Sequence, residues 1–215
     1  MYDRETKTLW SHLTGEALAG PLKGETLEMV SSVPRIAWKD WRAQYPETKV
    51  LSIGSNEDLV QDVYDGYHHS QRTGLFEPET VDRRFGLKDV VIGVRLDEAE
   101  KAYPLNKVFW KGKGESGGRL VQDTRADIPV LIYHDPRSYF TAVYDLRDAV
   151  GSTHEFSEPP QGKLAIDTDG DSWNLLTGEG PGNTVLRSLP HVNIYWFAWV
   201  DFYPKTEIYK EKPEN

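Results

Sequence analysis

The stretch Val90-Val91-Ile92-Gly93-Val94-Arg95-Leu96 is the clearest structural signal in the chain. Its β-branched and aliphatic residues predict a strand. Turn residues separate it from several similar runs, and no regular succession of helices alternates with them. The sequence therefore predicts a mainly β (or α+β) fold of antiparallel sheets with a few short helices. The other predicted strands are Ala102 to Leu105, Arg119 to Asp123, Pro129 to His134, Tyr139 to Leu146, Leu164 to Asp167 and Ser172 to Leu175.

Helical spacing occurs outside this β-rich block. Arg35 to Gln44 predicts a helix, because Trp38 and Trp41 fall on one face and Pro46 closes it. A strand is expected immediately afterwards, over Thr48 to Ser52.

Two further helices and a connector are expected. Ile194 to Phe202 is apolar at nearly every position, which predicts a helix buried on more than one side. Ser55 to Tyr67 begins with capping residues and predicts a short helix, and Gln71 to Lys88 reads as a connector.

Tryptophan-containing motifs occur twice in the chain, at offsets of 163 and 158 residues. Agreement at this many rare residues predicts an internal duplication. The paired positions are Trp10 and Trp173, Thr14-Gly15-Glu16 and Thr177-Gly178-Glu179, Trp38 and Trp196, Trp41 and Trp199, Tyr45-Pro46 and Tyr203-Pro204, and Thr48 and Thr206.

The two predicted copies differ in completeness, because few residues precede the first motif. The expected organisation is the second half of copy one over 1–52, a connector with a short helix over 53–88 and a complete copy two over 89–215, together forming one unit. A half-module exposes strand edges and apolar surface. We therefore expect self-association, or a partner that supplies the missing half-module.

Composition excludes several classes of site. The chain has no cysteine, which rules out disulfides, thiolate nucleophiles and Cys-ligated metals. Its net charge of −9 argues against binding to nucleic acid or to anionic lipid. No apolar run approaches the length that would insert into a membrane, and Met1 to Trp10 does not read as a signal peptide.

The first motif block resembles a family called domain of unknown function 3179, found in bacteria and archaea. The resemblance rests on Tyr2-Asp3-Arg4-Glu5-Thr6, Leu9-Trp10, Thr14-Gly15-Glu16-Ala17 and Gly20-Pro21-Leu22. The family name implies that no activity is established for it. Longer members carry an upstream half-module, often behind a secretion signal, which implies an envelope or secreted location.

The resemblance also bears on chemistry. The half-module of longer members commonly includes a Cys-Pro-Leu-Cys element on a strand, which points to metal binding or redox chemistry. The corresponding strand here runs through Ile132 to Arg137 without cysteine. If the family's chemistry depends on those thiols, this chain lacks it.

His134, Asp135 and Arg137 form the strongest candidate site, at the end of a predicted strand. The histidine beside a carboxylate could serve as a general base or metal ligand, and the arginine could orient an anion. A hydrogen-bonded turn is the favoured alternative. His68 and His69 could contribute to a metal site that includes His134, against a solvent-facing polar stretch.

His12, Glu16 and Glu179 are the remaining candidates for ligand binding. The glutamates recur in both copies, which favours a shared structural role, and the glycine before each fits a bend with positive φ. Asp167, Asp169 and Asp171 raise the possibility of a calcium loop, but a hairpin turn around Gly170 is the better interpretation.

Three hypotheses follow. The preferred one is a non-catalytic binding or structural module. The second is a metal-dependent or redox envelope protein that uses His and Asp ligands, with a metal ion as its cofactor. The third is a hydrolase that uses Glu16 or Glu179, although the sequence shows no convergent acid–base pair.

Overall fold

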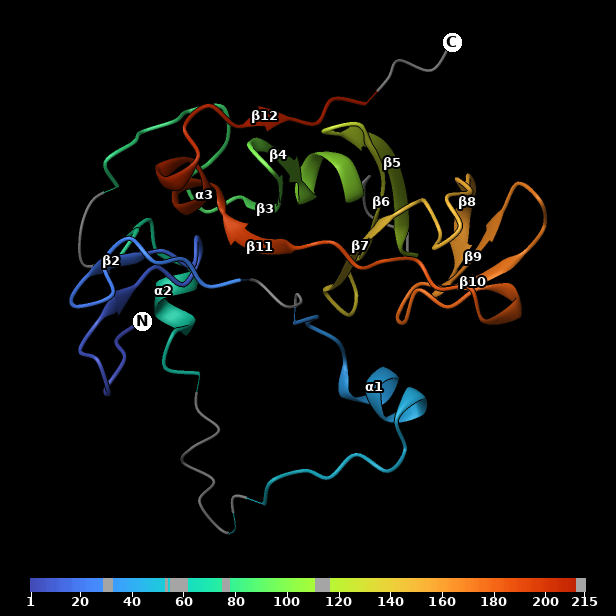
Figure 1. Cartoon of the computed structure of the whole chain (residues 1–215), viewed down its shortest axis with the longest axis horizontal. Helices are drawn as coiled ribbons and strands as arrows, with labels where there is room; N and C mark the ends of the chain where they lie inside the picture. Colours follow the sequence, from blue (N-terminus) through green and yellow to red (C-terminus); the bar gives the residue numbers. More distant parts are fainter. Residues whose placement is uncertain (29–32, 53, 55–61, 75–77, 111–116, 212–215) are drawn as a thin grey trace. The chain divides into compact units, whose positions relative to one another are not determined.

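The computed structural model describes residues 1–28, 33–52, 54, 62–74, 78–110 and 117–211 (Figure 1). The chain divides into two compact units, Met1–Ser32 and Val33–Asn215. Short antiparallel strands dominate both, so the predicted β-rich class is confirmed. The boundaries expected at residues 52 and 88 describe a duplication, and they stay predictions.

The first unit is a small hairpin. Strand β1 (Leu9–Trp10) pairs antiparallel with β2 (Ala17–Ala19). Trp10 and Ala17 are its buried apolar side chains. The backbone amide of Ser11 donates to the carbonyl of Glu16 at 2.8 Å, which closes the loop between the strands.

A sheet of three antiparallel strands is the middle layer of the second unit. Its strand order is β5-β6-β7, with β5 at one edge. The central strand is buried on both faces, which explains why its sequence is continuously apolar. The strands are β5 (Arg119–Arg125), β6 (Ile128–Asp135) and β7 (Phe140–Asp145).

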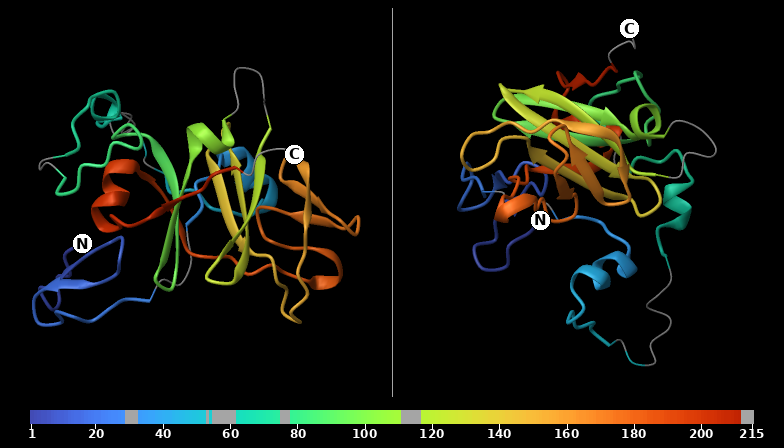
Figure 2. Two further views of the ribbon diagram at one scale, coloured as in Figure 1. Left: turned by 90° about the horizontal axis from the view of Figure 1, so that it is seen from above. Right: turned by 90° about the vertical axis from the view of Figure 1, so that its right-hand side faces the viewer.

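A second sheet packs against one face of this layer (Figure 2). It consists of β8 (Phe156–Gln161), β9 (Leu164–Asp167) and β10 (Ser172–Asn174), in the order β10-β9-β8. Phe156–Gln161 was not among the predicted strands, and it forms the edge strand β8, whose pairing with β9 shifts register between Ser157 and Gln161.

The third sheet packs against the other face of the middle layer, through Ile92, Val94 and Tyr103. Helix α3 covers its outer side, where Gly93 approaches the indole of Trp199. The sheet order is β11-β3-β4-β12, and the bounds are β3 (Val90–Leu96), β4 (Ala99–Pro104), β11 (His191–Tyr195), α3 (Trp196–Phe202) and β12 (Glu207–Ile208).

The predicted helices form with shifted boundaries. Helix α1 covers Trp38–Gln44, and the predicted helix from Ile194 begins only at Trp196, because its first two residues end β11. Most of the helix expected over 55–67 lies outside the described residues; α2 covers Asp65–His68. A π-helix (Leu105–Phe109) and a 3-10 turn (Pro181–Asn183) were not predicted.

The strand predicted over Thr48 to Ser52 is wrong, because these residues form no ladder. Their counterparts in the second motif include β12, a two-residue strand that forms by pairing with β4. The described residues offer no such neighbour to the first motif. A segment this short adopts the strand only where another strand completes its hydrogen bonds.

The two Trp-Trp-Tyr-Pro segments have the same local geometry. Both helices are seven residues long, and each ends in a residue at φ −127°. Trp41 and Tyr45 pack with ring centroids 4.5 Å apart, and Trp199 and Tyr203 at 4.4 Å. These segments therefore share one local design, while their common origin stays a prediction.

The two Thr-Gly-Glu motifs also match. Gly15 and Gly178 have φ values of +74° and +79°, which confirms the positive φ expected after threonine. Each glycine amide donates to the residue four positions earlier, at 2.9 and 2.7 Å. An added Cβ would lie under 3 Å from a carbonyl oxygen at both positions. Glycine is therefore required for conformation and for space.

Candidate functional site

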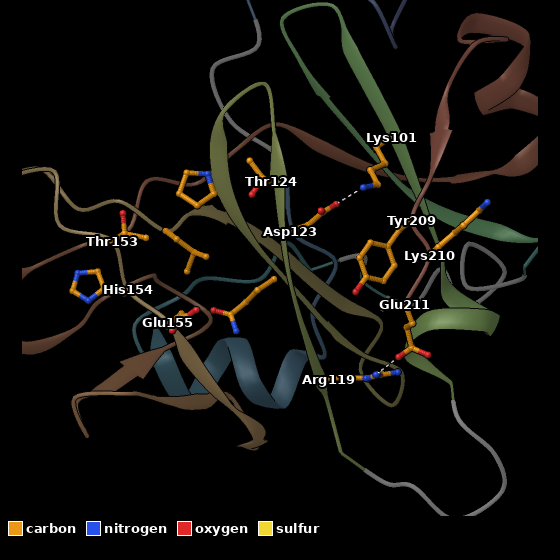
Figure 3. A pocket seen from close by; sticks show the side chains of 13 residues that line it. Lys101, Arg119, Asp123, Thr124, Thr153, His154, Glu155, Tyr209, Lys210 and Glu211 are labelled. Carbon is orange, nitrogen blue, oxygen red and sulfur yellow. Dashed lines mark hydrogen bonds and ion pairs between the residues drawn. The ribbon is translucent and has the colours of Figure 1, made fainter. Parts of the chain in front are cut away.

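A polar groove of about 810 Å³ runs along the edge of β5 (Figure 3). Strand β5 is the last strand in the order β5-β6-β7, so β6 is its one ladder partner among the described strands of that sheet. The groove is lined by Lys101, Arg119, Gln122, Asp123, Thr124, Pro129, Leu146, Thr153, His154, Glu155, Tyr209, Lys210 and Glu211.

The register of the β5–β6 hairpin determines which backbone groups point into this groove. The turn residues Ala126 and Asp127 both have positive φ, as in a type I′ turn, so the pair that flanks them is hydrogen-bonded. The next pair, Thr124 and Pro129, is not hydrogen-bonded, in keeping with the missing N–H of proline. Hydrogen-bonded and non-hydrogen-bonded pairs alternate along an antiparallel ladder. The N–H and C=O groups of Thr124 and, two residues away, of Gln122 therefore point away from β6.

A side-chain amide replaces direct pairing between β5 and the second sheet. The Nε2 of Gln122 donates to the carbonyl of Phe156 at 3.0 Å, and its Oε1 accepts from the Phe156 amide at 2.9 Å. Gln122 therefore links β5 to the first residue of β8.

One wall of the groove is built around Asp123. Its Oδ2 accepts hydrogen bonds from Lys101 Nζ at 2.5 Å and from Tyr103 Oη at 2.8 Å. Burial and the Asp123 charge both raise the pKa of Tyr103 well above its usual range, so the phenol stays a donor. Tyr209 stacks on Tyr103 with their ring centroids 5.3 Å apart, and Arg119 forms an ion pair with Glu211.

The opposite wall carries His154 and Glu155. The His154 ring lies 4.6 Å from the indole of Trp173, and its two nitrogens lie 3.4 Å from Asp148 and 3.5 Å from Asp167. Trp173 is 1% exposed beneath it. A ligand that shifts His154 would therefore alter the surroundings of a buried tryptophan.

His134, the central predicted residue, lies away from this groove. It is 2% exposed, and its Nδ1 lies 3.0 Å from the hydroxyl of Thr141. Burial lowers the pKa of His134 to about 4, and the neighbouring Asp135 offsets only part of this effect. The ring is therefore neutral near pH 7 and enclosed by the protein.

Asp135 ends β6, and Arg137 lies in the turn between β6 and β7. Asp135 accepts hydrogen bonds from the Arg137 amide at 3.0 Å and from the Ser138 hydroxyl at 2.6 Å, and its carboxylate pairs with Lys163 at 3.1 Å. Arg137 is exposed. The geometry is that of the hydrogen-bonded turn favoured from the sequence.

His68 and His69 lie at the end of α2. His68 Nδ1 lies 2.8 Å from the hydroxyl of Tyr195, while His69 contacts Asp65 at 3.4 Å. The described residues contain no group of three or more His, Asp or Glu side chains arranged to hold a metal ion. Metal binding by these histidines together with His134 stays a prediction.

The remaining candidates are exposed. His12 and Glu16 lie in the first unit, and Glu179 lies after the turn that follows β10. Glu16 and Glu179 each accept a backbone hydrogen bond through their carbonyl, from Ser11 and Asn174 respectively. Their recurrence therefore coincides with a backbone bond that closes the same turn, and a ligand role stays a prediction.

Asp167 is the last residue of β9 and precedes the turn around Gly170 that the hairpin interpretation expected. Its Oδ1 accepts the amides of Asp169 and Asp171, and its Oδ2 accepts the Trp173 indole N–H at 2.9 Å. Burial opposes ionisation, but these hydrogen bonds outweigh it and hold the pKa of Asp167 below its usual value. The carboxylate orients the hairpin and its tryptophan.

A family model described as "Protein of unknown function (DUF3179)" matches residues 1–206. The chain belongs to this family. The DUF3179 match covers both tryptophan-containing blocks, so the resemblance first drawn from residues 2–22 extends over nearly the whole chain. No curated protein and no solved structure shows a significant match.

No helix in the described part of this DUF3179 protein is long and apolar enough to cross a membrane. The groove along β5 was missed at the sequence level, because its wall residues are separated by up to 110 positions, from Lys101 to Glu211. The only local signal is the alternation within Arg119–Arg125, where the exposed Gln122 and Thr124 flank the half-buried Asp123.

Proposed function

We propose that this protein is a non-catalytic binding module that captures an extended polypeptide segment along β5. The segment adds to the edge of the middle sheet as a further strand. Main-chain hydrogen bonds supply affinity in this mode, and the pockets beside the strand supply specificity.

The outward backbone groups of Gln122 and Thr124 carry this proposal. They lie in the groove at the edge of the sheet, where they form a template for another strand. A groove of about 810 Å³ is in the size range of ligand sites, roughly 300 to 1,000 Å³. Its polar lining is suited to a solvated peptide rather than to an apolar small molecule.

The arrangement of ionisable groups favours binding over catalysis. Lys101, Asp123 and Tyr103 form one hydrogen-bonded cluster, and Arg119 is paired with Glu211. Such mutual pairing fixes the walls, and the raised pKa of Tyr103 keeps its phenol protonated.

A phage-displayed library of random peptides, seven residues long to match β5, tests the proposal. Selection on the full chain should enrich peptides that bind, and the tryptophan fluorescence should change on titration because Trp173 lies beneath His154. Failure to enrich any peptide contradicts the proposed function.

Two variants of one residue test the binding mode. Thr124→Pro removes the outward N–H without breaking the ladder to β6, so binding of the selected peptides should be lost. Thr124→Val keeps the N–H and should bind as the unchanged protein does. Circular dichroism of both variants checks the fold. Equal binding by a folded Thr124→Pro variant overturns strand addition.

A further inference from the structure

We infer that the segment bound along β5 is one in which acidic and basic side chains alternate. This inference rests on the proposed function and names the ligand class of that groove. It follows from the charges on the two walls and from the period of a β-strand.

The two walls lie on opposite faces of β5. The side chain of Asp123 points toward Lys101 and Tyr103, on the face shared with the third sheet. The neighbouring Gln122 points toward Phe156, on the face shared with the second sheet. Successive side chains of an added strand would therefore face one wall and then the other.

The walls differ in charge. Among the described lining residues, the wall toward the third sheet holds the cations Lys101, Arg119 and Lys210 and the carboxylates Asp123 and Glu211, an excess of one positive charge. The other wall holds Glu155 beside Thr153 and His154, so the carboxylate of Glu155 is its negative charge among the described lining residues.

Lys210 and Glu155 carry this asymmetry. Both are exposed, and neither forms an ion pair within the described part of the chain. Acidic side chains on the first face of the ligand and basic ones on the second complement both walls at once. Charge order, rather than total charge, then determines affinity.

Two peptides of identical composition test charge order. Both contain equal numbers of glutamate and lysine; in one they alternate, and in the other the glutamates occupy one half and the lysines the other. Fluorescence titration of the full chain at low salt should show the alternating peptide binding roughly tenfold more tightly. The preference should decrease as added salt screens the charges.

Glu155→Lys provides the matched control, because it makes both walls positive. The alternating peptide should lose its advantage over the block peptide, while an all-glutamate peptide should gain affinity. Reversing the charges of both walls together is uninformative, because the bound peptide can shift its register by one residue and so exchange its acidic and basic faces.

The outcomes separate the two proposals. Equal affinity of the two peptides, with library-selected peptides still binding, overturns the charge-order inference and leaves strand addition intact. An undiminished preference in Glu155→Lys overturns it as well. If neither charged peptide nor any library peptide binds, the proposed function fails.

Discussion

The indole Nε1 of Trp199 donates a hydrogen bond to the hydroxyl of Thr206 at 2.9 Å. The same bond joins Trp41 to Thr48 at 3.0 Å in the other motif. Burial distinguishes them: Trp199 is 1% exposed and Thr206 2%, whereas both partners in the first motif are half-buried.

Thr206→Val should lower the free energy of unfolding by roughly 2 kcal/mol, because it leaves the buried indole N–H of Trp199 without its acceptor. Thr48→Val should change the free energy of unfolding by less than about 0.5 kcal/mol, because water can bond to the half-buried indole N–H of Trp41 instead. Urea unfolding of both variants measures the difference. Equal losses would show that burial does not determine the value of this bond.

Gly93→Ala should destabilise the second unit. A Cβ at this position would lie 2.3 Å from the Trp199 ring, a clash that the buried indole has little room to relieve. Overpacking of this kind costs about 1 to 3 kcal/mol. Gly66→Ala is the control, because nothing lies within 4 Å of its added Cβ. The measurement is the midpoint temperature of thermal unfolding. If both variants unfold at the same midpoint as the unchanged protein, this packing is contradicted.

Stability should fall on acidification below pH 6.5 because of His134. Burial depresses its pKa in the folded protein to about 4, against a usual value of 6.5. The unfolded chain then binds the proton first. The contribution of His134 to the free energy of unfolding is therefore fully present above pH 6.5. It decreases as the pH falls toward 4, by about 3 kcal/mol in total.

His134→Leu should flatten this dependence in urea unfolding between pH 6.5 and 4. A slope should remain, because burial lowers the pKa of His191 in the same direction. The variant itself also loses the contact with Thr141, so its unfolding free energy is compared across pH rather than with the unchanged protein at one pH. An identical slope in both proteins would exclude His134 as a source.

Self-association should occur through the segment around α1. Val33 is 93% exposed, Trp38 49% and Leu51 89%, while the counterpart of Trp38, Trp196, is fully buried. Size-exclusion chromatography with light scattering should show species larger than a monomer. Trp38→Lys should shift them toward monomer, whereas Trp110→Lys, at an exposed tryptophan elsewhere, should not. A monomer at high protein concentration would contradict the prediction.

Much of the fold was predictable from local patterns. Val90 to Leu96 forms β3 with the predicted bounds, because a β-branched run has few alternatives. The turn around Gly170 was also correct, since its geometry depends on neighbouring residues. By contrast, the strand expected over Thr48 to Ser52 failed, because a strand needs a neighbour that the pattern cannot supply.

The candidate site was less accessible to sequence analysis. His134 was selected for its position beside Asp135, but its ring is enclosed by distant residues that include Phe109. The groove along β5 brings Lys101, Glu155 and Lys210 to the walls of one strand. No spacing in the sequence indicates this, because three separate sheets and their connections determine it.

The sequence by itself determined the positions of most strands, the tight glycine turns and the two tryptophan-containing helices. These follow from residue volume, backbone freedom and short-range hydrogen bonds, which act within a few positions of the chain. The tertiary structure alone decided which strand is left at an edge and which charges face each other across it. Those depend on which surfaces pack together over long distances in the chain.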